Sequence, residues 1–454
     1  MLHRIEYGLD CLLDHYIVAC IVLAQFIMTL LGVGDVRTVS LVGLLLCGVG
    51  LVRGSAQVDL WVFLPMVFYI LTGMASAFAV YGNISDGYAS LQMIFPVLYL
   101  LLACLEEEEM RLLRRLCTAW AGAVAALGIG QFVFRAVFLG RASRLGGLLG
   151  NPNALGIFLV TGWFLLLGCL HGRERTVLTY LEPVLLIALA LTLSMGSFAA
   201  MAAGILVLLL AKKREASWGE TFRYGGGLLA RASLGIGTGV LLYLAAARTD
   251  VPWICVPLLL YGAAVTVLWP GYKRYLTAVP EMAAVISALG VLVAVILVAV
   301  RPSSIATFLE RLEMMASALR YLTVNPLLGV GPYQWRLLDL YDGGTYFNTW
   351  HIHNALLHVG VEMGWIAMAM LTAVVVRAFR KRAEPPVRAG FAAFCVHNMM
   401  DTSFFYLGIT ALVLIAAGNP RSGGRKLDGL GLKLVFGLFA ALFVLHFSYS
   451  LRAV

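Results

Sequence analysis

The sequence is poor in charged residues, and this excludes an ordinary soluble protein. Only 13% of its 454 residues are Asp, Glu, Lys or Arg, whereas 61% are hydrophobic and the mean hydropathy is +0.90. A soluble domain has about 25% charged residues. No long polar stretch separates the apolar segments, which excludes several soluble domains in one chain. We therefore expect residues 1–454 to form a single polytopic membrane domain.

Metal-binding and disulfide patterns are also absent from the sequence. Its eight cysteines lie in or next to apolar segments, none forms a CxxC pair, and none lies in the polar stretch around His351 and His353. The chain contains no HExxH pattern and no cluster of carboxylates at ligand spacing. These absences predict buried, reduced cysteines and no metal centre. The first residues show no cleavable signal pattern, and we expect an interfacial helix over Met1–Tyr16.

Long apolar stretches, in contrast, recur along the whole chain. A bilayer offers backbone groups no water, so each spanning segment must be a helix. The sequence therefore predicts an all-α protein with 12–15 transmembrane helices, of which residues 177–211 form one long or broken helix. The predicted spans are 16–34, 38–52, 58–80, 91–105, 116–139, 154–170, 177–193, 196–211, 226–246, 253–269, 281–300, 352–376, 388–401, 403–418 and 430–449.

The basic residues between the predicted spans indicate an orientation. With the N-terminus inside, every rich Lys/Arg cluster falls on the inner side, as the positive-inside rule requires. The net charge of +9 is therefore typical of a membrane protein and implies no nucleic acid. The inner basic residues are Arg53, Arg111, Arg114, Arg115, Arg173, Arg175, Lys212, Lys213, Arg214, Arg223, Lys273, Arg274, Arg377, Arg380, Lys381, Arg382, Arg388, Arg421, Arg425 and Lys426.

The longest loop, residues 301–350, is predicted to lie outside and to carry part of the active site. Its first part predicts a helix along the outer membrane surface, because apolar residues recur at helical spacing. These are Ile305, Phe308, Leu309, Leu312, Met315, Leu319 and Leu322. Pro326, Gly329, Gly331 and Pro332 then end the helix and indicate a tight turn.

His353 is the candidate catalytic residue. It follows a polar aromatic loop and precedes an apolar span, and neutral imidazole accepts a proton near pH 7. Asn354 can cap the next helix or hold the imidazole by a hydrogen bond. His351 points elsewhere and is predicted to be supporting or structural, and His358 to be a packing or polar-network residue. A histidine at a membrane interface is more often structural than catalytic. The assignment of His353 as catalytic therefore rests on the polar loop before it and the apolar span after it.

Arginines on the predicted outer side run against the positive-inside trend. One explanation is interfacial anchoring by snorkelling. The other is an anionic ligand such as a diphosphate, which Arg144 and Arg311 can grip through two parallel hydrogen bonds each. Glycines near Arg144 allow close backbone approach, and the Asn151-Pro-Asn turn can cap the helix that follows.

Three stretches together resemble the O-antigen ligase and polymerase superfamily of membrane glycosyltransferases. "RLGGLLGNPNALG" (144–156) is similar to the family's Arg–Gly–Asn-Pro-Asn segment. "RLEMMASALRYLTVNPLLGVGPYQW" (311–335) is similar to its Arg-led amphipathic helix and Pro-Leu-Leu-Gly-Val-Gly turn. "HNALLHVGVEMGWIA" (353–367) is similar to the family's pattern of His-Asn, nine residues, then Gly and a small residue. The stretches cover about a tenth of the chain.

The resemblance implies transfer of a glycan from a polyprenyl-diphosphate carrier to an acceptor hydroxyl, with inversion and without a metal or other cofactor. His353 would accept or orient the hydroxyl proton, and Arg144, Arg311 and Arg320 would bind the diphosphate. The partners would be the lipid-linked glycan, a glycan or lipid-anchored acceptor, and membrane lipid, at the outer face of a bacterial cytoplasmic membrane. The predicted supporting residues are Asn354, Asn151, Gly329, Gly331, His351 and Glu362.

The sequence departs from the family at Met195, where an arginine is expected. One phosphate contact is therefore missing or comes from Arg311, Arg320 or Arg141. Ligase, polymerase and protein O-glycosylation activities all remain open. The alternative function is transport, as a polysaccharide flippase or a small-solute carrier, for which ionisable residues within spans and repeat symmetry are typical. A structural membrane subunit is the third alternative.

Overall fold

The protein is an all-α polytopic membrane protein, as predicted. The computed structural model describes residues 15–170, 177–248, 252–299, 302–342, 347, 349–380, 383–418 and 424–452. Among these residues, eight helices are long and apolar enough to cross a membrane, and further apolar helices of 10–17 residues accompany them. The chain gathers into two compact units, which are described one by one.

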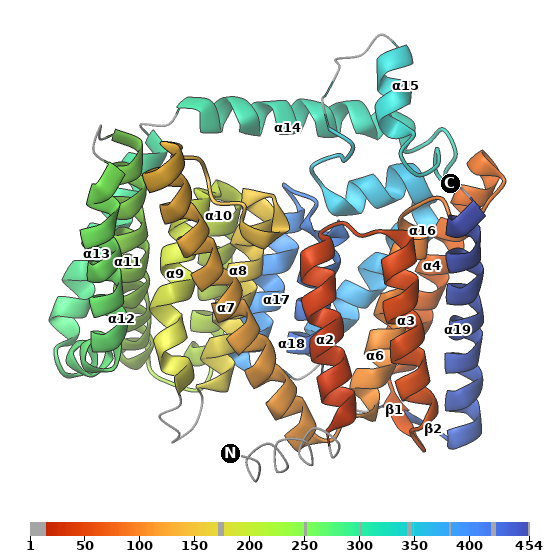
Figure 1. Cartoon of the computed structure of the whole chain (residues 1–454), viewed down its shortest axis with the longest axis horizontal. Helices are drawn as coiled ribbons and strands as arrows, with labels where there is room; N and C mark the ends of the chain where they lie inside the picture. The colour runs from red at the N-terminus through yellow and green to blue at the C-terminus, as the bar shows by residue number, and fades with distance from the viewer. Residues whose placement is uncertain are drawn as a thin grey trace. The chain divides into compact units, whose positions relative to one another are not determined.

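Unit 1 comprises residues 1–116, 311–383 and 398–454. In it α3 packs against α2 and α19, which stand upright beside it in Figure 1, and α4 packs against α16. Its helices are α2 (Tyr16–Leu31), α3 (Val36–Leu51), α4 (Leu60–Tyr81), α5 (Tyr88–Gln92), α6 (Ile94–Cys104), the start of α7 (Glu107–Leu139), the second half of α14 (Pro302–Tyr321), α15 (Trp335–Tyr341), α16 (Ala355–Arg380), η4 (Ser403–Phe405), α18 (Leu407–Ala417) and α19 (Gly429–Arg452).

Unit 2 comprises residues 117–310 and 384–397. At its centre α9 packs against α8 and α11, and α13 covers another side of α11. Besides the rest of α7 and the first half of α14, its helices are η1 (Gly147–Leu149), α8 (Pro152–Cys169), η2 (Val177–Tyr180), α9 (Leu181–Thr192), α10 (Met195–Lys213), α11 (Trp218–Arg248), η3 (Pro252–Ile254), α12 (Cys255–Ala278), α13 (Pro280–Ala299) and α17 (Pro385–Asn398).

Of the two alternatives left open for residues 177–211, one long helix or a broken one, the structure has the broken helix. Leu193 takes a left-handed conformation with φ 48°, which ends α9, and the Ser194 side chain accepts a hydrogen bond from Ser197 N and caps α10. Two helices extend beyond their predicted spans, α7 to 33 residues and α11 to 31. Hydropathy marks only the apolar part of a helix, whereas the backbone hydrogen bonds continue into the polar turns.

Basic residues predicted to be inside gather at one end of unit 1. Arg53 pairs with Glu109 at 2.8 Å and Arg377 pairs with Asp59 at 2.9 Å. Next to Asp59, the short strand β1 (Ala56–Val58) pairs antiparallel with β2 (Arg425–Leu427), which brings Arg425 to the same end. This arrangement agrees with the predicted alternation of loops, and the side of the membrane stays a prediction.

Three predictions are not tested by the described residues. The interfacial helix expected over Met1–Tyr16 lies, up to residue 14, outside the described part of the chain. The same holds for residues 301, 343–346 and 348 of the loop 301–350. Because each unit is described by itself, the single membrane domain over 1–454 stays a prediction.

Candidate functional site

The site begins with a break in α16. Its backbone leaves the helical conformation at Gly364, with φ 86° and ψ 174°. The preceding turn segment, residues 325–335, packs along this break and supplies partners for backbone groups that the helix no longer satisfies. Three hydrogen bonds join them: Val330 N to Val361 O at 2.8 Å, Gly331 N to Glu362 O at 3.1 Å, and Trp365 N to Pro326 O at 2.7 Å.

Two glycines make this close approach sterically possible. A Cβ atom on Gly329 would lie 2.6 Å from the carbonyl oxygen of Glu362, and one on Gly364 would lie 2.7 Å from the backbone nitrogen of Leu328. Both glycines also have positive φ, at 73° and 86°. A side chain at either position would meet backbone atoms that have no room to move, so the predicted tight turn depends on these two residues.

Glu362 fastens the turn segment from inside the break. Its carboxylate is fully buried and accepts hydrogen bonds from Tyr333 N at 2.8 Å and Trp335 N at 3.2 Å. His358 Nε2 lies 3.4 Å from the same carboxylate, and Ile352 N donates to His358 Nδ1 at 3.4 Å. The ring therefore carries its proton on Nε2 and is neutral. Tyr333 is held at φ 64°, a strained value for a non-glycine residue.

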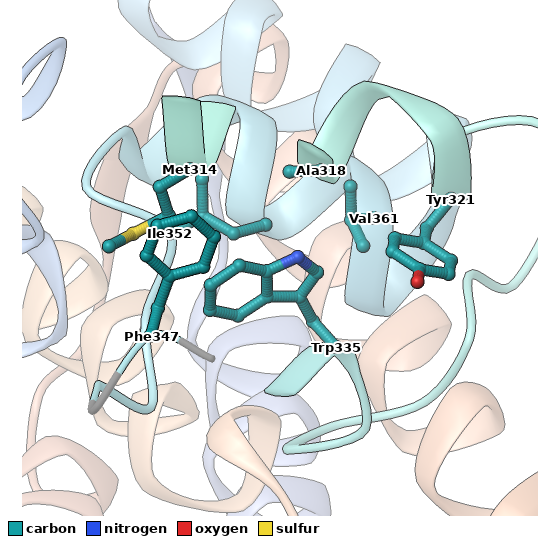
Figure 2. Close-up of a cluster of buried hydrophobic side chains, with 7 residues drawn as sticks. All are labelled: Met314, Ala318, Tyr321, Trp335, Phe347, Ile352 and Val361. Atoms are coloured by element: carbon teal, nitrogen blue, oxygen red, sulfur yellow. The ribbon is translucent and has the colours of Figure 1, made fainter. Parts of the chain in front are cut away.

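A cluster of apolar side chains holds the second half of α14 against Trp335, which ends the turn segment, and against the residues just before and within α16. Figure 2 shows the Trp335 indole at its centre, and the Phe347 ring stacks on that indole with centroids 6.1 Å apart. Burying a large apolar side chain contributes roughly 1.5–3 kcal/mol. The helix predicted from Ile305 to Leu322 is thus confirmed as α14, and its second half is anchored through residues of this cluster. They are Met314, Ala318, Tyr321, Trp335, Phe347, Ile352 and Val361.

His353 lies between this cluster and the start of α16. Ile352 before it is buried in the cluster, and Asn354 after it accepts a hydrogen bond from Leu357 N at 2.9 Å and so caps α16. The His353 side chain is 24% exposed, so the ring reaches the surface. Its Nδ1 is buried, makes no hydrogen bond, and lies 4.0 Å from the Asp401 carboxylate. That distance is too long for a hydrogen bond.

Arg311 and Asp401 form an ion pair beside His353. The Arg311 guanidinium lies 3.3 Å from Asp401 Oδ2 and also donates to the Met400 carbonyl. Thr402 N donates to Asp401 Oδ1 at 2.8 Å. Burial lowers the pKa of His353, the Arg311 charge lowers it further, and Asp401 partly opposes both. His353 is therefore neutral at pH 7 and can accept a proton.

His351 lies among aromatic rings on the inner side of the loop. Its ring centroid is 5.1 Å from both His358 and Phe405 and 5.7 Å from Tyr88. Burial lowers the pKa of His351 to about 4, so this ring also stays neutral near pH 7. Tyr88 in turn contacts Tyr333, with centroids 4.5 Å apart. His351 thus lies among aromatic rings, and its supporting role stays a prediction.

Of the other predicted arginines, Arg320 lies in unit 1. It is 57% exposed on α14 and pairs with Asp339 at 3.1 Å. Asp339 also accepts a hydrogen bond from the Ser317 hydroxyl. The charge of Arg320 is thus shared with a carboxylate and screened by solvent.

Arg144 lies in unit 2, at the break between α9 and α10. Its Nε donates to Thr192 O at 2.9 Å and its Nη2 to Asn153 Oδ1 at 2.8 Å. The predicted cap is confirmed, because Asn151 accepts hydrogen bonds from Asn153 N and Ala154 N at the start of α8. Met195, the first residue of α10, lies at the same break.

The structure thus brings His353, Arg311 and their neighbours together in unit 1 and leaves Arg144 and Asn151 in unit 2. The sequence reading missed Asp401 as a partner of His353. A signal was present, because His353 begins the inward span 352–376 and Asp401 ends the outward span 388–401 that directly follows it, which puts both residues at the outer side. It also missed the contacts of Tyr88 and Tyr333, which no spacing in the sequence indicates.

Comparison with known proteins adds no identification. No protein-family model matches the chain, and no curated protein is significantly similar to it. Among the residues that the structure describes, no three His, Cys, Asp or Glu side chains gather where they could hold a metal ion.

Proposed function

We propose that this protein transfers a glycan from a polyprenyl-diphosphate carrier to an acceptor hydroxyl. The proposed location is the extracytoplasmic face of a bacterial cytoplasmic membrane, where a lipid-anchored donor and a water-borne acceptor meet. The proposal rests on the resemblance of three stretches to membrane glycosyltransferases and on the surroundings of His353. Ligase, polymerase and protein O-glycosylation remain variants of the same chemistry.

The observation that carries the proposal is a neutral histidine between an ion pair and the surface. His353 is 24% exposed, and its buried Nδ1 faces the carboxylate of Asp401. A carboxylate on one nitrogen orients the ring so that the other nitrogen can act as a base. The distance of 4.0 Å is compatible with this role, because such contacts often tighten only when substrate binds.

In the proposed reaction the acceptor oxygen attacks the anomeric carbon of the donor sugar. The new bond joins that carbon to the acceptor oxygen, and the bond from the carbon to the diphosphate oxygen breaks. The hydroxyl proton passes to His353, and the electron pair leaves with the diphosphate. One direct displacement inverts the anomeric centre. The chain's own basic side chains supply the positive charge that the leaving group requires.

Two arginines are proposed to stabilise the leaving diphosphate. Arg311 is only 15% exposed, where a charge acts more strongly than in water, and Asp401 holds it in place. Arg144 takes this role from the resemblance of its segment. The exposed Arg320 is proposed as a weaker, peripheral contact.

A purified transfer assay with His353→Ala tests the proposal. Loss of a general base costs about 100-fold to 10,000-fold in rate. We therefore expect transfer to fall at least about 100-fold while the protein inserts and purifies normally. Full activity of this variant would remove His353 from the mechanism.

Two further variants separate catalysis from folding. His15→Ala is the matched control, because His15 precedes α2 and makes no capping hydrogen bond, and it should leave transfer unchanged. Asp401→Asn keeps the side-chain shape and removes its charge. As a positioning change it should lower the rate less than His353→Ala and move the acidic limb of the pH–rate profile to lower pH.

Transport is the second candidate, and one observation favours it. Glu182, Arg231 and Lys273 form a charged cluster on spanning helices of unit 2, and ionisable residues inside spans often mark transport pathways. Reconstituted vesicles distinguish the two functions. Movement of a lipid-linked glycan across the bilayer without a new glycosidic bond would favour the flippase.

A further inference from the structure

A buried charged cluster in unit 2 has no role in the proposed transfer reaction. Glu182 lies in the first turn of α9 and is fully buried. Its carboxylate accepts hydrogen bonds from the indole nitrogens of Trp269 at 2.9 Å and Trp163 at 3.4 Å. The same carboxylate pairs with Arg231 of α11 at 3.4 Å and with Lys273 of α12 at 3.5 Å. Four helices thus contribute to one group of charges.

The cluster carries an excess of positive charge. Two cations face one carboxylate, which leaves a formal charge of +1, and no other carboxylate among the described residues pairs with either cation. Arginine has five N–H donors and an ammonium has three, and among the described residues the side chains of Arg231 and Lys273 form hydrogen bonds or ion pairs with Glu182 only. The remaining donors are accessible, because Arg231 is 14% and Lys273 24% exposed.

The cluster lies near the end of unit 2 that is predicted to be inside. Glu182 and Arg231 are each five residues into their predicted spans, 177–193 and 226–246, and Lys273 is four residues past the span 253–269. At about 1.5 Å per residue, the three lie within roughly 8 Å of the predicted membrane edge. Leu268 and Tyr275, on the same helix as Lys273, are 67% and 48% exposed. Such apolar residues in a spanning helix are suited to lipid.

We propose that Arg231 and Lys273 bind the phosphate of an acidic phospholipid from the inner leaflet, and that Glu182 offsets one of their two positive charges. Basic sites between transmembrane helices near the cytoplasmic surface suit anionic headgroups. A phosphate would neutralise the excess charge and accept hydrogen bonds from the unused N–H groups of Arg231 and Lys273. The acyl chains would lie along the apolar surface of α12. This site is independent of the glycan-transfer chemistry.

The experiment uses the full chain in nanodiscs of phosphatidylcholine with increasing fractions of dibrominated phosphatidylglycerol. Bromine quenches nearby indoles, and Trp269 and Trp163 both contact the cluster. We expect saturable quenching that brominated phosphatidylcholine does not reproduce. Arg231→Gln leaves one cation for Glu182, so the buried carboxylate stays paired, and the apparent affinity should fall about fivefold, the effect of one basic residue near a membrane surface. Arg111→Gln, an equal charge change at an exposed pair, should change nothing.

A second variant separates a lipid site from a purely structural ion pair. Glu182→Gln raises the formal charge of the cluster to +2, so an anion site should bind the acidic lipid more tightly. A structural ion pair would be weakened and would gain no affinity. Loss of the quenching in this variant, unchanged quenching in Arg231→Gln, or equal competition by inorganic phosphate would each overturn the proposal.

Discussion

Glu362 in unit 1 and Glu182 in unit 2 are both completely buried, yet their partners are of different kinds. Glu362 accepts hydrogen bonds from two backbone N–H groups and lies beside a neutral histidine. Glu182 accepts from two indoles and faces two cations. The first carboxylate fixes a loop, because backbone donors define where the chain must run. The second gathers charge, because side chains from separate helices converge on it.

The helix positions of the two glutamates agree with this difference. Glu182 lies in the first turn of α9, where the helix dipole favours a negative charge. Glu362 lies two residues before the break at Gly364, at the end of a helical segment, where the dipole disfavours it. The Glu362 carboxylate therefore depends on direct hydrogen bonds, and the turn segment of residues 325–335 donates them. The loop and the carboxylate depend on each other.

The largest effect is expected when a side chain fills the space at the break of α16, where the turn segment of residues 325–335 packs. Gly364→Ala places a Cβ against the backbone of Leu327 and Leu328 at a positive φ. We expect a loss of at least about 4 kcal/mol or failure to fold, because neither backbone can retreat. Thermal unfolding in detergent measures this.

Gly437→Ala in α19 is the control for that change, because a Cβ there meets nothing within 4 Å. It should be neutral or stabilise the helix by about 0.5–1 kcal/mol. Equal stability of the Gly364→Ala and Gly437→Ala variants would show that the turn segment of residues 325–335 does not need the space at Gly364.

Isosteric substitutions compare the two glutamates directly. Glu182→Gln leaves Arg231 and Lys273, which are 14% and 24% exposed, without their counter-charge. Breaking a buried pair costs about 3–5 kcal/mol, and this partial exposure favours the lower end of that range. Glu362→Gln keeps one acceptor oxygen and leaves one backbone N–H unsatisfied, which costs about 1–3 kcal/mol. Thermal unfolding without acidic lipid should show the larger loss for Glu182→Gln. The reverse order would contradict the distinction between the two sites.

The smallest predicted effect is a dependence of local stability on pH that is confined to residues 349–363 of unit 1. Burial lowers the pKa of His351 to about 4, whereas a histidine in an unfolded chain titrates near 6.5. As the pH falls below 6.5, the proton therefore binds to His351 in the unfolded state before it binds in the folded state. The free energy of unfolding residues 349–363 falls by about 2 kcal/mol between pH 7 and pH 5 as a result. Hydrogen exchange should rise there in residues 349–363 before it rises in α9 and α12.

His351→Phe tests the origin of that dependence. Phenylalanine keeps an aromatic ring against Tyr88 and Phe405 and removes the titrating nitrogen. The pH-dependent exchange in residues 349–363 should flatten in this variant. An unchanged profile would assign the effect to another group.

The class of protein, the segments that become helices and several helix ends were predictable from the amino-acid sequence alone. Hydropathy, helical spacing and capping are local properties, which is why α14, the Asn151 cap and the break after α9 were predictable. The sequence also singled out His353, whose proposed role awaits the transfer assay.

Which distant side chains meet depends on the packing of the helices and became known from the folded structure. Asp401 lies 48 residues from His353 in the chain, and Glu182 lies 91 residues from Lys273. The partner of a buried charge depends on which helices pack side by side, and no local pattern encodes that choice. The same reason explains why the sequence indicated only a tight turn at Gly329 and no particular conformation at Gly364, whereas the structure shows two backbones passing through the space that their missing side chains leave.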